Sequence, residues 1–182
     1  MSMTTAAVLG TGAWGTTFAQ VLADAGVSVM MWGRNADTIS FINGGENPTY
    51  LPGISLSERI SATSDIAEAV AGRELVVVAV PVKAVRATLS AARESFAPDV
   101  ALLSLAKGLE LGSLKRVDEI IAEASGVPGS RIAVLSGPNL SREIAQRQPT
   151  ATVVAATDVE LAKEIAKACH NSYFRPYVST DV

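Results

Sequence analysis

A glycine-rich turn near the start of the chain constrains the fold more than any other feature. Residues Gly10–Gly15 read GTGAWG and follow a short apolar run at residues 6–9. Gly10 permits a tight turn off a strand, Gly12 lets the backbone approach a pyrophosphate, and Gly15 lets a helix pack closely. A helix that begins here offers free N–H groups and the positive end of its dipole to phosphates.

The residues after the turn complete a strand–helix–strand unit. Gly26 stands where the helix would end, and residues 28–32 read as a second strand. The apolar face of the helix consists of Phe18, Val21, Leu22 and Ala25. The whole unit takes about thirty residues, as a βαβ unit does. It therefore predicts a dinucleotide site at Gly10, Gly12 and Gly15; a structural turn without a ligand is the alternative, which this context disfavours.

Strand and helix patterns alternate along nearly the whole chain. Several strand candidates are continuous Val, Leu and Ala runs, which are typical of strands buried on both faces of a parallel sheet. We predict an α/β fold, a Rossmann-like doubly wound and mostly parallel sheet with helices on both faces, as a single domain over residues 1–182. The strand candidates are residues 6–9, 28–32, 59–62, 75–80, 100–105, 132–135, 150–155 and 173–178.

Three further helices are expected between these strands. One begins at Ser64 or Asp65 and runs to Val70. The second carries Leu114, Val117, Ile121 and Ala124 on one face. The third begins with a capping box from Thr157 to Glu160 and continues with Leu161, Ile165 and Ala168 on one side.

The composition limits the classes of function. Of 182 residues, 48% are hydrophobic, the mean hydropathy is +0.30 and the net charge is −3. There is no basic stripe, so no nucleic-acid partner is expected. Cys169 is the single cysteine and excludes an internal disulfide framework; with His170 it is interpreted as a helix end rather than a metal site. The sequence shows neither a signal peptide nor a spanning apolar stretch, so a cytoplasmic protein without membrane insertion is expected.

The residue after the second strand bears on the choice of cofactor. Ligands of a doubly wound sheet bind at the carboxyl ends of its strands, and a strict NAD binder usually has an acidic residue at this position. This chain has Arg34 there. A guanidinium can hold a 2′-phosphate bidentately, so Arg34 favours NADP, or tolerance of both NADP and NAD. The alternative is a solvated surface charge.

Further candidates follow later strands. Pro81 ends the fourth strand and would lie beside the cofactor, although a simple strand terminator explains it equally well. Lys107 follows the fifth strand and could meet a phosphate or a substrate hydroxyl, and the small-residue turn 136–141 opens another helix. Residues 43–57 interrupt the alternation, and their Tyr50 could reach a ligand or pack the loop down.

Six motifs occur in an order and at a spacing that match a known family. They read GTGAWGT, VMMWGRN, NPTYLPG, VVVAVPV, LSLAKGLE and SGPNLSREIAQRQPTA, and they cover nearly the full chain. The chain closely resembles the N-terminal, cofactor-binding domain of bacterial NAD(P)-dependent glycerol-3-phosphate dehydrogenase. The resemblance implies hydride transfer between NAD(P) and the pair dihydroxyacetone phosphate and sn-glycerol 3-phosphate, for glycerophospholipid synthesis.

The resemblance also assigns residues to ligands. It implies that Ala13, Trp14, Arg34, Tyr50 and Ser141 bind the cofactor, that Gly137 and Asn139 bind the substrate, and that Lys107 contacts both. Two positions depart from the family pattern, which often has Ser at Ala13 and Ser or Thr at Asn139. The first departure removes a hydroxyl from the cofactor site, and the second changes the polar group offered to the substrate.

The resemblance places the catalytic residues outside this chain. Alcohol oxidation needs a base for the hydroxyl proton. The only histidine, His170, is far from the strand ends, and Lys107 alone is too little for a complete active site. In the family, a helical domain just beyond Val182 supplies a lysine proton acceptor, an arginine for the substrate phosphate and most of a homodimer interface. We therefore expect no catalytic residue here, and weak cofactor binding with little or no turnover by residues 1–182 alone.

Three other functions fit parts of the sequence. One is a stand-alone dinucleotide-binding regulatory module, and a second is the cofactor domain of another 6-phosphogluconate dehydrogenase-like enzyme. The third is a methyltransferase with a similar glycine turn, which Arg34 disfavours because an acidic ribose ligand is expected there.

Overall fold

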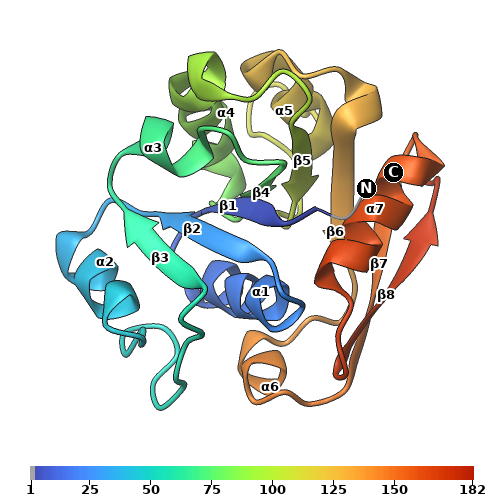
Figure 1. Ribbon diagram of the computed structural model, residues 1–182. Coiled ribbons are helices and arrows are strands. Elements are labelled where there is room, and N and C mark those ends of the chain that lie inside the picture. Colours follow the sequence, from blue (N-terminus) through green and yellow to red (C-terminus); the bar gives the residue numbers. More distant parts are fainter. Residues whose placement is uncertain (1–2) are drawn as a thin grey trace.

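A single mixed sheet organises the part of the chain that the computed structural model describes, residues 3–182 (Figure 1). Its order is β3-β2-β1-β4-β5-β6-β7-β8. Strands β1 to β6 are parallel, β7 runs antiparallel to β6, and β8 runs parallel to β7. The strands are β1 Thr5–Leu9, β2 Ser28–Trp32, β3 Ile60–Thr63, β4 Leu75–Val78, β5 Ala101–Ser104, β6 Ile132–Ser136, β7 Thr150–Ala156 and β8 Phe174–Ser179.

Helices cover both faces of the sheet (Figure 1). One apolar cluster joins the sheet to α1, α2, α6 and α7, and a second joins the opposite face to α3, α4 and α5. The helices are α1 Ala13–Asp24, α2 Ala36–Asn43, α3 Ile66–Val70, α4 Val82–Ala92, α5 Val117–Ser125, α6 Ser141–Ala145 and α7 Val159–Cys169. The predicted doubly wound, mostly parallel fold is confirmed. No helix in residues 3–182 is long and apolar enough to cross a bilayer.

The central strands are buried on both sides, as their apolar runs predict. In β1, Ala6 and Val8 belong to one apolar cluster, and Ala7 and Leu9 belong to the other. Leu9 pairs with Val78 of β4, which in turn pairs with Ser104 of β5. These parallel strands therefore end at one edge of the sheet, and the loops that follow them meet there.

The predicted strand ends agree with the structure to within two residues. The largest difference is in β4, which ends at Val78 rather than at residue 80. Pro81 therefore does not end the strand, and that prediction is wrong. Pro81 is the N-cap of α4. The N–H groups at the start of a helix have no intrahelical acceptor, so the missing N–H of proline loses no helical hydrogen bond there.

Two predicted helix starts are wrong. Leu114 is not on the face of α5: it precedes the helix, has a positive φ of 58° and is 72% exposed. Helix α7 is capped by Asp158, whose carboxylate accepts from the Glu160 N–H, rather than by Thr157. Helices α2 and α4 have no counterpart among the helical faces derived from the sequence. Gly26 at the end of α1, with φ of 98°, and the Cys169–His170 end of α7 are as predicted.

A half-buried carboxylate ties the end of α1 to two distant segments. Asp24 accepts hydrogen bonds from Gln20 Nε2 at 2.7 Å, Arg147 Nε at 3.0 Å and the Tyr173 hydroxyl at 2.8 Å. Burial by itself would raise the pKa of Asp24, but the hydrogen bonds from these three side chains bring that pKa below its ordinary value of 3.8.

This carboxylate predicts an acid-dependent contribution to stability. Because the folded-state pKa of Asp24 lies below the unfolded-state value, its stabilisation is present above about pH 4 and is lost as the pH falls through the folded-state pKa. Asp24→Asn should lower the free energy of unfolding by about 1–3 kcal/mol at pH 7. The difference from the unmodified protein should shrink below pH 4, as measured by urea unfolding at several pH values. A difference that is the same at pH 7 and pH 3 contradicts this assignment.

Candidate functional site

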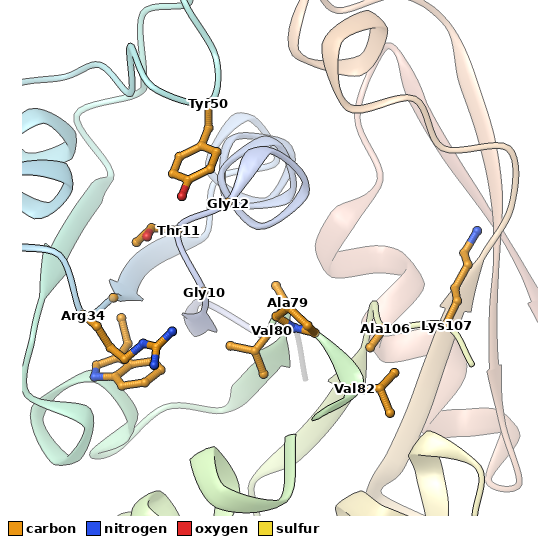
Figure 2. Close-up of a pocket in the computed structure, with 13 residues that line it drawn as sticks. Gly10, Thr11, Gly12, Arg34, Tyr50, Ala79, Val80, Val82, Ala106 and Lys107 are labelled. Atoms are coloured by element: carbon orange, nitrogen blue, oxygen red, sulfur yellow. The ribbon is translucent and has the colours of Figure 1, made fainter. Parts of the chain in front are cut away.

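A cleft of about 660 Å³ lies at the carboxyl edge of the parallel strands (Figure 2). We call it the main cleft. The loops after β1, β2, β4 and β5 form its walls, which is where a doubly wound sheet binds its ligands. It is lined by Gly10, Thr11, Gly12, Trp32, Gly33, Arg34, Tyr50, Ala79, Val80, Pro81, Val82, Ala106 and Lys107.

The glycine turn forms one wall of the main cleft, and a side chain would not fit at Gly10 or at Gly15. Gly10 has a φ of 123°, and a Cβ there would lie 2.9 Å from the Ala79 carbonyl oxygen. A Cβ at Gly15 would lie 2.3 Å from the Gly10 carbonyl oxygen, so α1 packs directly on the turn. A Cβ at Gly12 would meet no atom within 4 Å. Only Gly12 therefore faces open space, which a ligand can fill.

Helix α1 begins at this wall with an uncapped N-terminus. Its N-cap is Gly12, no side chain among the described residues caps it, and its first turn has no acidic residue. Its first backbone hydrogen bond runs from Thr16 N–H to the Gly12 carbonyl, which leaves the preceding N–H groups without intrahelical acceptors. Side chains cap α2, α3 and α7, whereas α4 and α6 are uncapped like α1. The uncapped end of α1 suits an anionic ligand.

The charged side chains of the main cleft are both cationic. They are Arg34 and Lys107, and no carboxylate is among its described lining residues, although the whole chain has a net charge of −3. Figure 2 shows Arg34 and Lys107 at opposite ends of the cleft. The exposed Arg34 guanidinium makes no hydrogen bond or ion pair with a described residue, while Lys107 Nζ donates to the Gly137 carbonyl at 2.9 Å. This arrangement can hold two separated negative groups.

Tyr50 covers the glycine turn from a long loop. Figure 2 shows its ring on the same side of the cleft as Thr11 and Gly12. The side chain is 47% exposed and also lines a smaller pocket of about 150 Å³, which we call the side pocket. Ala13 and Ser141 line the side pocket as well. Ala13 and Ser141, two predicted cofactor residues outside the main cleft, therefore line a pocket that shares Tyr50 with it.

The turn after β6 meets the main cleft through Lys107. Gly137 supplies the carbonyl that holds the Lys107 ammonium, and a Cβ at Gly137 would lie 3.1 Å from Thr152 Oγ1. The buried Thr152 hydroxyl donates to the Ser136 carbonyl at 3.0 Å and accepts from Asn139 Nδ2 at 3.2 Å. Strand β7 thus holds this turn in place beneath the lysine.

The structure brings most of the predicted site residues together. Six line the main cleft, namely Gly10, Gly12, Arg34, Tyr50, Pro81 and Lys107. Ala13 and Ser141 line the side pocket. Four line neither pocket, namely Trp14, Gly15, Gly137 and Asn139. The Trp14 ring packs edge-on against Phe18 at 5.8 Å, so what this residue offers the cleft is its backbone N–H in the first turn of α1.

Sequence reasoning missed the apolar part of the lining. Ala79, Val80, Val82 and Ala106 line the main cleft, but small apolar residues carry no chemical signal; only their place after β4 and β5 could have indicated them. His170 lines a separate pocket beside Pro176 and takes no part in the cleft. No group of His, Cys, Asp and Glu side chains within residues 3–182 could hold a metal ion.

Comparisons with known proteins agree on one family. The sequence model of the family described as NAD-dependent glycerol-3-phosphate dehydrogenase N-terminus matches residues 5–162 of this chain. Glycerol-3-phosphate dehydrogenase [NAD(P)+] from Thermobifida fusca is 51% identical over 182 residues, and the match covers 99% of this chain and 54% of that protein. The Streptomyces griseus enzyme of the same name is 51% identical over 178 residues, which cover 97% of this chain and 53% of that enzyme.

A solved structure of 29% identity agrees with the sequence relatives. The crystal structure of glycerol-3-phosphate dehydrogenase from Coxiella burnetii superposes with a TM-score of 0.91 at 29% identity, and the match covers 99% of this chain and 55% of that one. The chain therefore spans about half the length of the curated relatives it matches.

The glycine geometry predicts two different outcomes for the same substitution. Gly15→Ala should lower the free energy of unfolding by about 1–3 kcal/mol, because its Cβ would overlap a backbone oxygen that cannot move aside. Gly12→Ala should change it by less than about 1 kcal/mol, because φ there is −70° and the space is open. Urea unfolding of both variants measures the difference, and equal losses would show that the close packing of α1 on the turn does not limit position 15.

Proposed function

Because the chain belongs to the family of N-terminal domains of NAD-dependent glycerol-3-phosphate dehydrogenase, we propose that its main cleft binds NAD or NADP in an enzyme that interconverts sn-glycerol 3-phosphate and dihydroxyacetone phosphate. The observation that carries this proposal is the uncapped N-terminus of α1 at an acid-free cleft. A pyrophosphate supplies the negative charge that this helix end lacks.

The cleft divides into regions that suit the parts of a dinucleotide. Gly12 and the free N–H groups of the first turn suit the pyrophosphate. Arg34 borders both the main cleft and a further pocket of about 350 Å³ beside α2, which suits the adenosine half. Val80, Val82 and Ala106 give an apolar wall towards Lys107, which suits the nicotinamide half. When bound, the nicotinamide carries the hydride of the reaction.

The position of Lys107 supports a phosphorylated or polyol substrate at its end of the cleft. Its ammonium is exposed and is held by the Gly137 carbonyl, so a substrate oxygen would find a fixed donor there. We propose that Lys107, Gly137 and Asn139 together bind the substrate. No imidazole or carboxylate is among the described lining residues, so we also propose that the proton acceptor comes from outside residues 3–182.

The described lining of the main cleft, which contains no imidazole or carboxylate, also fits a second function, a dinucleotide-binding regulatory module without catalysis. A measurement of turnover distinguishes this regulatory module from the dehydrogenase. Four expectations from the sequence stay predictions. They are a homodimer, no nucleic-acid partner, a cytoplasmic location and a role of the product in glycerophospholipid synthesis.

Binding and turnover together test the proposed function. The purified protein should bind NADH or NADPH, and Gly12→Ala should weaken that binding at least about tenfold because its Cβ enters the space left for the pyrophosphate. Protein expressed from its complete gene should oxidise the reduced cofactor when dihydroxyacetone phosphate is added. Binding without turnover would support the regulatory module, and no binding would overturn both. Turnover by residues 1–182 alone would refute the external proton acceptor.

The choice between the cofactors rests on Arg34, and we propose that NADPH is preferred. Arg34→Ala should weaken NADPH binding about 10- to 100-fold, because a charge-assisted bidentate contact to the 2′-phosphate is lost. NADH binding should change less than about threefold. Arg59→Ala, which removes an exposed arginine just before β3, controls for net charge. Equal losses for NADPH and NADH would show that Arg34 does not read the 2′-phosphate.

A further inference from the structure

We propose that Asn47 is a positioning residue that holds the Tyr50 loop and the glycine turn together as one cofactor-binding unit. The proposal rests on the proposed cofactor site, because its effect is measured as dinucleotide binding. Neither the glycine motif nor the residues assigned by resemblance include Asn47, which lies in the long segment between α2 and β3.

Asn47 joins segments that are far apart in the sequence. Its side chain is fully buried, and its Nδ2 donates to the Thr11 carbonyl at 3.0 Å and to Thr16 Oγ1 at 2.8 Å. The Thr16 hydroxyl in turn donates to the same Thr11 carbonyl at 3.2 Å. Two donors therefore converge on one carbonyl of the glycine turn, and one of them belongs to the Tyr50 loop.

The orientation of the Asn47 amide is set by its neighbours. Its Oδ1 is buried and accepts no hydrogen bond from a described residue. Turning the amide over would place that oxygen against the Thr11 carbonyl, which is also an acceptor, so the observed orientation is the one that the turn requires. The hydrogen bonds that this side chain makes with described residues are therefore those of Nδ2, to Thr11 and Thr16.

Fixing the Thr11 carbonyl also fixes a donor of the main cleft. The peptide bond is planar and trans, so the Thr11 carbonyl and the Gly12 N–H point in opposite directions. With the carbonyl directed at the buried Asn47, the Gly12 N–H is directed away from it and donates to no described group. Gly12 lines the main cleft. Asn47 thereby orients a free backbone donor at the place proposed for the pyrophosphate.

The same residue places Tyr50 on the cleft. The backbone carbonyl of Asn47 accepts from the N–H groups of Tyr50 at 3.2 Å and Leu51 at 2.8 Å, so a short turn starts at Asn47. The base of this loop closes on itself, through the bridge between Glu46 and Ser55. With its side chain on Thr11 and its carbonyl on the Tyr50 turn, Asn47 sets the distance between the aromatic ring and the glycine turn.

Asn43 provides a matched control from the end of α2. Its side chain is more exposed than that of Asn47 but also makes two hydrogen bonds, donating to the Ala62 carbonyl at 3.0 Å and accepting from the Ala62 N–H at 2.8 Å. Those bonds tie α2 to β3, and Asn43 lines neither the main cleft nor the side pocket. Leucine in place of either asparagine keeps the approximate size and the charge and removes the hydrogen bonds.

The experiment compares NADPH affinity across these variants. Kd is measured for the purified protein well below the unfolding temperature of each variant. Asn47→Leu should raise Kd about tenfold, and Asn43→Leu should leave it within about twofold. In a Tyr50→Ala background the effect of Asn47→Leu should fall to about threefold, because Asn47 then has only the Gly12 N–H left to orient. A purely structural role would lower the unfolding temperature without this dependence on Tyr50.

The other possible results test the proposed site and the positioning role of Asn47 separately. If the unmodified protein binds no NADPH or NADH, the proposed function fails first. If it binds and Asn47→Leu binds equally well, or if the loss is the same with and without Tyr50, the positioning role is overturned. If Asn47→Leu does not fold, Thr16→Val carries the test, since it removes both an acceptor of the Asn47 amide and the second donor to the Thr11 carbonyl with little change in shape. An unchanged Kd in Thr16→Val would then refute the proposal.

Discussion

The close packing of α1 on the glycine turn is the contact on which the site depends. A Cβ at residue 15 would lie 2.3 Å from the Gly10 carbonyl oxygen, and a Cβ at residue 10 would lie 2.9 Å from the Ala79 carbonyl oxygen, so the helix can begin this soon after β1 only if both positions are glycine. This short connection brings the first N–H groups of α1 to the edge where β1, β4 and β5 end. A bulkier residue at either glycine would move the helix end away from the cleft, and its dipole would then be of no use to a ligand.

The sequence predicts the fold well because the sheet is mostly parallel and buried on both faces. Strands of this kind are continuous apolar runs, which are visible without knowledge of their partners. The misses have local causes. Leu114 fits a helical period but precedes α5 with a positive φ. Helix α4 does carry its buried residues at the spacing of one face, with Thr88 among them, and a pattern restricted to apolar residues passes over it.

The sequence predicts some residues of the main cleft and gives no indication of others. Arg34 and Lys107 stand directly after strands and carry charge, so the strand-end rule finds both. The apolar lining has no such signal. Asn47 opens the motif NPTYLPG, but one sequence gives it no role, because an asparagine before a proline in a loop is typical of an ordinary turn. Its role follows from burial and from a partner 36 residues away, neither of which is local.

The two ends of the main cleft are held by different halves of the sheet. Arg34 and the glycine turn belong to the β1–β3 half, and the buried Asn47 connects the turn to its covering loop. Lys107 follows β5 and is held by the turn after β6, which β7 fixes through Thr152. Because β7 returns antiparallel beside β6, its buried threonine can reach the Ser136 carbonyl directly. A shift within one half would therefore leave the other half of the cleft in place, so changes at the Arg34 end and at the Lys107 end should act separately on the proposed binding of cofactor and of substrate.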